Sequence, residues 1–268
     1  MLTTLLNLTM LSLFKSKPLL DEHDANTLID LFVWATEHFD HQYFLQQTRV
    51  VEPTGEFFPE KVSSIEEMSQ TLFKRVKQYA GMSKWPVNLA EPNQMPLQQQ
   101  FPFFQFDKGL RGDEIALLMP PHQQVYLSYN PNQINQPQDL VASMANGLAL
   151  VMLHHVGAKL PGEIDPAIVT DMLSIYLGFG VMITNTAYHF RGSCASCYNP
   201  YANRQAALGE DECLFLHALV CHFKPEVDGA KHLKPHLKSQ FKRAKKQVAG
   251  MIEQSANPLL LAMEHASA

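Results

Sequence analysis

The chain is poor in cysteine, with four in 268 residues. That number is too small for a disulfide-stabilised secreted scaffold, so we expect a cytoplasmic protein whose thiols are reduced or bind a metal. The chain also lacks an excess of positive charge. Its net charge of −5 and pI near 6.2 give no overall attraction to phosphate backbones, so a nucleic-acid partner is not expected unless a local patch binds it.

No hydrophobic run is long enough for an ordinary membrane span. Residues 1–14 are almost uniformly apolar and residues 172–183 carry no charge, whereas a bilayer core needs about 20 apolar residues. We therefore expect no transmembrane span. Residues 1–14 are predicted to form a surface or core helix, with a membrane anchor as the alternative, and translation from Met1 or from Met10 is equally compatible with this opening.

Apolar periodicity, caps and turn residues divide the chain into helices and short strands. Helices are predicted at 24–39, 64–79, 137–156, 165–188, 210–223 and 235–254, and strands at 101–106, 115–119 and 124–129. A stretch rich in Pro, Asn and Gln predicts an irregular connection at 85–100. The predicted fold class is α+β, predominantly helical with a small β-sheet, organised as an N-terminal extension (1–17), a single domain (18–255) and a C-terminal tail (256–268).

Four segments carry a resemblance to a known family: YFLQQTRVVEPTGEFFPEKV, FKRVKQYAGMSKWPVNL, LVASMANGLALVMLHHVG and VTDMLSIYLGFGVMITN. Together they resemble a family of uncharacterised bacterial proteins related to zincin-type metallopeptidases, over about residues 18–250. The resemblance implies a zincin-like fold with His-Glu-x-x-His on the helix after the sheet. In that motif two histidines reach one zinc ion from the same helix face, and the glutamate activates the metal-bound water.

This chain departs from the motif at each essential position. The matching residues are Asn146, Gly147 and Leu150, which replace an imidazole, a carboxylate and a second imidazole. An amide oxygen is a weak zinc ligand, and the other two side chains supply no ligand or base. We expect Leu150 to fill the vacated site and the cleft to close around a dry core. The sequence therefore argues against peptidase activity.

The resemblance also places an acidic ligand three residues before a Thr-Asp pair. Thr170 and Asp171 are present, but the ligand position is Ala167. Two interpretations of the remaining polar groups stay open. His154 could line a remnant pocket with Thr170 and Asp171 and bind a metal, or Asp171 could make a structural polar contact within the helix pair.

A second group of potential ligands lies towards the C-terminus. The sequence Cys-Ala-Ser-Cys is followed by three residues at helical spacing, and the five candidates are Cys194, Cys197, Cys213, His217 and Cys221. A paired Cys-x-x-Cys with two further ligands is typical of structural zinc sites. Buried or free thiols and a redox pair are the alternatives. Our leading expectation is that the protein has no cofactor, with structural zinc in this cluster as the alternative.

Lysine and arginine dominate the stretch from Lys224 to Lys246. An apolar stripe runs through the same residues, so the basic side chains are predicted to be the solvated face of an amphipathic helix. Contact with nucleic acid or with an anionic membrane surface is the alternative. The leading hypothesis is a non-catalytic binding or scaffold protein with a protein or small-molecule partner. A metalloenzyme or zinc-stabilised protein using Cys194 and Cys197 and an adaptor using the basic helix are the alternatives.

Overall fold

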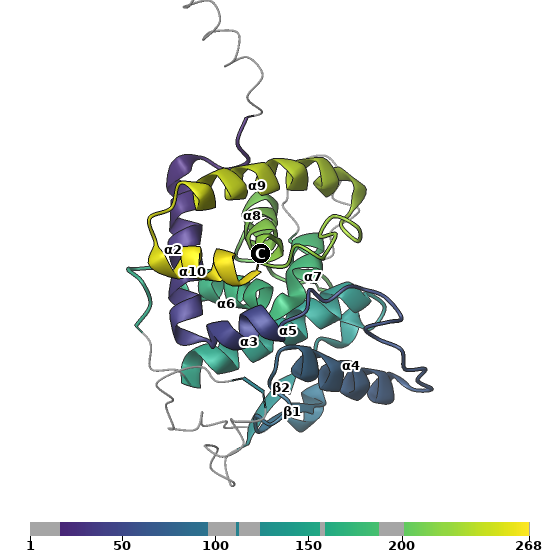
Figure 1. The fold of residues 1–268 in the computed structure, drawn as a ribbon. Helices are drawn as coiled ribbons and strands as arrows, with labels where there is room; N and C mark the ends of the chain where they lie inside the picture. Colours follow the sequence, from purple (N-terminus) through teal and green to yellow (C-terminus); the bar gives the residue numbers. More distant parts are fainter. Residues whose placement is uncertain (1–16, 96–110, 113–123, 156–158, 188–200, 268) are drawn as a thin grey trace, which may run out of the picture.

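A computed structural model describes residues 17–95, 111–112, 124–155, 159–187 and 201–267. Most of these residues are helical (Figure 1). The helices are α2 (Glu22–His38), α3 (His41–Gln46), α4 (Ile65–Tyr79), α5 (Pro137–His155), α6 (Pro166–Ser174), α7 (Gly180–Asn185), α8 (Glu210–His222), α9 (Pro235–Glu253) and α10 (Pro258–Ser267). The described chain also contains two 3-10 turns, η1 (Pro92–Gln94) and η3 (Pro131–Gln133), and one π-helical turn, η4 (Ile175–Phe179).

The predominantly helical α+β class is confirmed. The predicted helices starting near residues 24, 64, 137, 210 and 235 correspond to α2, α4, α5, α8 and α9. The start of α4 shows why the sequence predicts it, because the Ser64 hydroxyl accepts a hydrogen bond from the Glu67 amide at 3.1 Å and the Glu67 carboxylate accepts one from the Ser63 amide. The short α3 was not predicted. It begins after Asp40, whose carboxylate accepts from the Tyr43 amide at 3.0 Å.

The core is built around the continuous run α6–η4–α7, over which α5 and α8 pack. The prediction of a buried helix there is confirmed, since residues 169–187 are buried throughout. The run is interrupted at Gly178, whose φ of 106° is unfavourable for other residues. A β-carbon at this position would lie 2.2 Å from the Arg49 carbonyl oxygen, and the Val51 amide donates to the Gly178 carbonyl at 2.8 Å. Gly178 therefore lets the loop before α4 lie directly on the core.

This run is also the one stretch of the described chain that is long and apolar enough to cross a membrane by length and composition. It covers Pro166–Asn185, and 89% of its most apolar 18-residue window is buried inside the fold. Helices α5 and α8 supply much of that covering. Its hydropathy is accounted for by packing within this structure.

The described sheet has two parallel strands, β1 (Val87–Ala90) and β2 (Val125–Ser128), paired from Val87 with Val125. Strand β2 confirms the prediction at 124–129. The prediction of an irregular connection at 85–100 is wrong for residues 87–90, which form β1. Pairing with β2 and hydrogen bonds from side chains of α4 supply partners for the backbone groups of this strand. Lys77 donates to the Val87 carbonyl at 2.9 Å and Gln70 to the Leu89 carbonyl at 3.1 Å. The strands predicted at 101–106 and 115–119 lie outside the described residues.

The predicted C-terminal tail differs from the structure. Residues 258–267 form α10, in which Leu260 and Met263 are buried. The Asn257 side chain accepts from the Leu259 amide at 2.9 Å and so begins the helix. The sequence predicted a tail for this short apolar stretch. Burial of Leu260 and Met263 makes it part of the packed structure.

Candidate functional site

The motif positions lie on the least buried face of α5. Asn146, Gly147 and Leu150 are half-buried and His154 is exposed, whereas the flanking positions on the other side of the helix are core residues. The expectation that Leu150 fills a closed dry core is therefore wrong. On this face, Gly147 lies against Leu127 of β2, and Asn146 reaches α6.

Gly147 has a packing role in addition to lacking a catalytic side chain. A β-carbon at this position would lie 3.1 Å from the Leu127 Cδ1 atom of β2, closer than ordinary contacts. The absence of a side chain thus lets β2 approach α5. A glutamate here would displace Leu127, so the loss of the base and the position of the sheet are coupled.

Asn146 does not face open space. Its Nδ2 donates to the Asp171 Oδ1 at 2.8 Å, which joins α5 to α6. Asp171 is only 1% exposed. An ionised carboxylate at this depth requires a counter-charge and several hydrogen-bond donors, because burial without them costs several kcal/mol.

Arg204 supplies that counter-charge. Its Nη1 lies 2.5 Å from the Asp171 Oδ1, and the two side chains are 3% and 2% exposed. The other carboxylate oxygen accepts from the amides of Ala207 and Leu208 at 2.8 and 3.1 Å. Asp171 therefore accepts four hydrogen bonds, two at each oxygen.

Further contacts fix Arg204 in this position. Its Nε donates to the Thr186 hydroxyl at 3.2 Å, and its backbone amide donates to the Asp139 carboxylate at 2.8 Å. The neighbouring Asn203 donates to the Gln136 side chain at 2.7 Å. Among the described residues, the Arg204 Nη2 is buried without a hydrogen-bond partner. We call the group of Asn146, Asp139, Asp171 and Arg204 the buried polar network.

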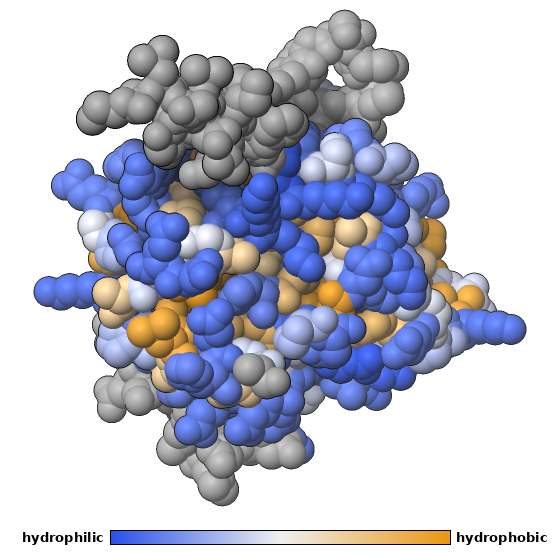
Figure 2. Space-filling model, turned by 45° about the horizontal axis from the view of Figure 1, so that its top comes forward, coloured by the Kyte–Doolittle hydropathy of each residue, from blue (hydrophilic) through white to orange (hydrophobic). Residues whose placement is uncertain are grey.

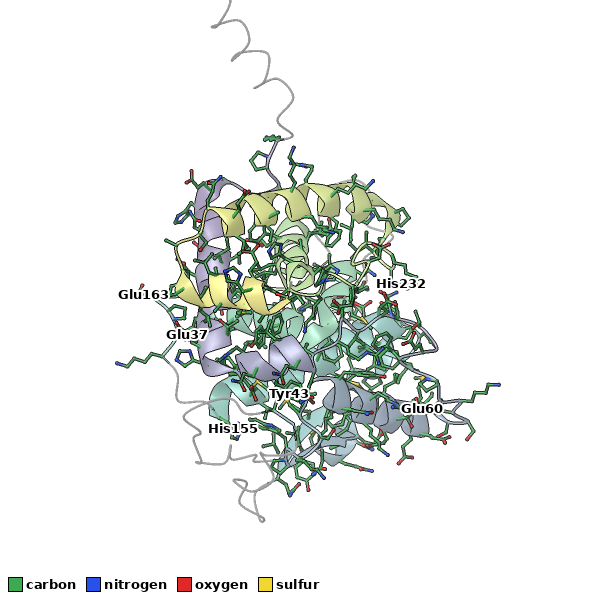
Figure 3. All side chains as sticks on the ribbon, viewed as in Figure 1. Glu37, Tyr43, Glu60, His155, Glu163 and His232 are labelled. Atoms are coloured by element: carbon green, nitrogen blue, oxygen red, sulfur yellow. The ribbon has the colours of Figure 1, made fainter. Side chains whose placement is uncertain are left out.

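The three residues of the predicted remnant pocket differ in burial, because Thr170 and Asp171 are buried whereas His154 is not. His154 is exposed and lies eight residues, or about 12 Å of helix, beyond Asn146. The Thr170 hydroxyl donates to the Pro166 carbonyl at 2.7 Å within its own helix. Asp171 makes the polar contacts with Asn146, Arg204 and the loop amides that are described above. Figure 3 labels the neighbouring His155, which marks this end of α5.

The zinc ion implied by the family resemblance does not fit the motif positions. Ala167, at the expected acidic ligand position, is exposed in the first turn of α6, where its amide donates to the Asp165 carboxylate. Asn146 uses its amide nitrogen to bind Asp171, and both Asp171 oxygens are occupied by donors. The remaining oxygen of Asn146 is a single weak ligand, whereas zinc sites use three or four strong ones.

The second predicted group divides between described and undescribed residues. Cys194 and Cys197 lie outside the described residues. Cys213 and Cys221 are buried on α8, and eight residues separate them by about 12 Å, too far to share one metal. Within the described part of the chain, no group of three His, Cys, Asp or Glu side chains could hold a metal ion. The site that combines both halves stays a prediction.

His217 and Cys221 form a neutral contact. The His217 Nε2 donates to the Gly229 carbonyl at 2.9 Å, and the Cys221 sulfur lies 3.8 Å from the ring nitrogens. Burial lowers the pKa of His217 to about 4 and raises the pKa of Cys221 to about 12. Burial likewise raises the pKa of Cys213 far above its ordinary value. A zinc-binding or redox thiol needs a stabilised thiolate, which this environment disfavours.

A separate groove of about 640 Å³ lies between α4 and β1. Gln70, Lys77 and Leu89 line it, so its floor is the hydrogen-bonded edge described above. No motif residue of α5 lines this groove, and its lining does not include the ion pair of the buried polar network.

Sequence reasoning identified Asp171 and Asn146 but missed Arg204 and Asp139. One signal could have found Arg204: a lone aspartate in a strongly apolar helix requires a buried cation, and Arg204 follows in a polar loop. Comparisons with protein-family models, curated proteins and solved structures found no match for this chain.

Proposed function

We propose that this chain is a non-catalytic binding or scaffold protein on a zincin-like framework, with a protein or small-molecule partner. The single observation that carries the proposal is the contact between Asn146 and the Asp171–Arg204 ion pair. At the position where the resembling family has a zinc-binding imidazole, this chain has an amide that is part of a satisfied structural network.

The charges of this network explain why a metal is unnecessary. In a zinc site, the divalent cation neutralises the carboxylate and activates a bound water. Here the guanidinium of Arg204 neutralises Asp171. A guanidinium stays protonated at all physiological pH values and has no coordination site for water. The network can therefore hold α5, α6 and the loop at residues 201–208 together, but it supplies no nucleophile.

The test combines metal content with peptidase assays on protein purified without a histidine tag. Elemental analysis is expected to find zinc well below one ion per chain, or zinc that Asn146→Ala does not remove. The triple variant Asn146→His, Gly147→Glu and Leu150→His is expected to hydrolyse no casein or peptide substrate with zinc added, because Ala167 still lacks the acidic ligand.

Ser143→His provides the matched control, since Ser143 lies on the same half-buried face of α5. It shows whether a histidine on this face collects zinc without the motif. The proposal fails if the wild-type protein hydrolyses peptides in a chelator-sensitive manner. It also fails if the protein contains one zinc ion per chain that Asn146→Ala removes.

A further inference from the structure

A buried arginine lies beside a cavity at the C-terminal end of α4. Arg111 is 3% exposed, and its guanidinium carbon lies 4.5 Å from the centre of the Tyr43 ring and 5.4 Å from that of Tyr176. Its Nη2 donates to the Thr48 hydroxyl at 2.8 Å. Its Nε and Nη1 are buried without a hydrogen-bond partner. A guanidinium offers several N–H donors in a fixed plane, so most of the hydrogen-bonding capacity of Arg111 is unused.

The charge of Arg111 is also uncompensated within the described chain. No ion pair between described residues involves it. Burial lowers the pKa of the Arg111 guanidinium, whereas nearby acidic groups, among them Asp40, raise it. Leaving a buried charge unpaired costs several kcal/mol, so this position is expected to attract an anion.

Lys224 adds a second positive charge to the same region. It is 5% exposed, and its ammonium donates to the carbonyls of Phe44 and Leu45, both at 2.6 Å. Burial, together with the charge of Arg111, lowers the pKa of Lys224 to about 8. Two cations are thus buried near α3 with neutral groups as their hydrogen-bond acceptors.

The cavity beside Arg111 has a volume of about 490 Å³ and a mostly polar lining. It lies between α3, the end of α4 and residues 111–112. Four glutamine amides line it, together with the Asp40 carboxylate and the Tyr43 ring: Gln42, Gln46, Gln47 and Gln78. Its volume falls within the range of about 300–1,000 Å³ that is usual for small-molecule sites.

Close packing fixes the backbone around this cavity. The Gly112 amide donates to the Gly81 carbonyl at 2.7 Å. A β-carbon at Gly81 would lie 2.7 Å from the Tyr43 Cζ atom, and one at Gly112 would lie 3.0 Å from its Cε2 atom. Tyr43, labelled on α3 in Figure 3, therefore packs directly on two glycines and in turn supports the Arg111 guanidinium.

Asp40 supplies the opposite charge in this cavity. Its Oδ1 accepts from the Tyr43 amide at 3.0 Å, and its Oδ2 accepts no hydrogen bond from the described residues. Asp40 and Arg111 interact electrostatically but do not form an ion pair with each other. Such a separation is what a ligand that bridges the two charges requires.

We infer that this cavity binds a free α-amino acid, whose carboxylate pairs with Arg111 and whose ammonium pairs with Asp40. Because the Arg111 nitrogens are buried, the guanidinium is expected to turn towards the cavity when the carboxylate binds. A phosphate fits less well, because Asp40 repels a dianion. A neutral sugar would leave the charge of Arg111 uncompensated. The inference is independent of the proposed function, which rests on α5 and α6.

The lysines of α9 form a different kind of surface. They are exposed, in agreement with the predicted solvated face: Lys238, Lys242, Lys245 and Lys246. Figure 2, in which the α9 side is turned forward, shows hydrophilic residues over much of this surface. On the same helix, Arg243 donates to the Pro18 carbonyl and Gln247 accepts from the Leu19 amide, both at 2.8 Å. A solvated lysine needs no ligand to balance its charge, whereas a buried arginine does.

Thermal shift and titration calorimetry of the full chain test the inference. The standard amino acids are compared at about 5 mM, and at least one is expected to raise the melting temperature. The amino acid with the largest shift is then compared by calorimetry with its N-acetyl derivative, its C-terminal amide and inorganic phosphate. Each derivative lacks one of the two charges, so each is expected to bind about tenfold or more weakly than the parent.

Variants at the two charged residues assign the site. Arg111→Met is expected to weaken binding about 100-fold. It is not expected to lower the melting temperature of the protein alone, because it removes an uncompensated buried charge. Asp40→Asn keeps an acceptor for the Tyr43 amide and is expected to weaken binding about tenfold. The matched control is Arg49→Met, which removes an arginine that also lies 4.5 Å from a ring centre, that of Phe57, but outside the cavity.

Three results would overturn the inference. The first is that no standard amino acid binds. The second is equal binding of the parent amino acid, its N-acetyl derivative and inorganic phosphate, which would make the cavity a general anion site. The third is unchanged binding in both Arg111→Met and Asp40→Asn, or an equal loss of binding in Arg49→Met.

Discussion

Two polar clusters are buried in the core, one between α6 and the loop before α8 and the other on α8, and their ionisable groups respond to burial in opposite ways. In the buried polar network, Asp171 and Arg204 form a close ion pair. In the His217–Cys221 contact, burial lowers the pKa of the imidazole and raises that of the thiol, so both groups are neutral. The comparison shows that burial of ionisable side chains does not by itself indicate reactivity. The first cluster is stabilised by an ion pair, whereas the second is stable because both of its groups are neutral.

The largest expected effect is at the charged cluster. Asp171→Ala leaves the Arg204 guanidinium buried without a counter-charge and is expected to lower the free energy of unfolding by about 3–5 kcal/mol in urea titrations. Asp165→Ala is the control on the same helix. It removes only the cap that accepts from the Ala167 amide and is expected to cost about 1 kcal/mol.

A double variant sharpens that test. Asp171→Leu combined with Arg204→Met replaces the ion pair by apolar side chains and is expected to recover much of the stability. Equal instability of the double variant and of Asp171→Ala would show that the hydrogen bonds to Ala207 and Leu208 matter more than the charges.

The neutral cluster is expected to respond to pH. The unfolded chain protonates His217 near pH 6.5, whereas the folded chain does so only near pH 4. The unfolded state therefore binds more protons in this window, and stability falls as the pH falls from 6.5 to 4. The loss from this group is expected to reach about 3 kcal/mol at pH 4.

Urea titrations across this pH range measure the effect. His217→Gln is expected to flatten the slope between pH 6.5 and 4, even if it lowers stability at neutral pH. His23→Gln, at an exposed position in α2, is the control. An unchanged slope in His217→Gln would mean that other groups cause the acid instability.

The smallest expected effect is at the edge of the charged cluster. Asn146→Ala removes one hydrogen bond to Asp171, which keeps its other three donors, and is expected to cost about 1 kcal/mol. A double-mutant cycle with Asp171→Ala measures the coupling. A cost no larger than that of Ser143→Ala, on the same face, would show that Asn146 is not an energetic part of the network.

The sequence predicted the helices because their signals are local. Ser64 with Glu67 marks the start of α4, and the apolar spacing of residues such as Leu237 and Phe241 marks α9. Strand β1 was missed because side chains from α4 and pairing with β2 stabilise it, and these residues are distant in sequence.

The candidate site was only half predictable for the same reason. A motif pattern identifies Asn146 and the missing ligands, since their spacing along one helix is fixed. The partner Arg204 lies 33 residues beyond Asp171, and no local pattern connects them. Conversely, the spacing of Cys213, His217 and Cys221 suggested a metal site, although spacing does not reveal how burial shifts the protonation of each group.

The hydrogen bonds from Arg243 and Gln247 of α9 to residues 17–20 have a consequence for the order in which the fold forms. The residues that these hydrogen bonds join are separated by 225 to 228 positions in the sequence. During synthesis the amino-terminal residues leave the ribosome long before Arg243 and Gln247 exist. Residues 17–20 thus find their anchoring partners only after α9 has been synthesised, and a product that ends before α9 would lack the side chains that hold this segment.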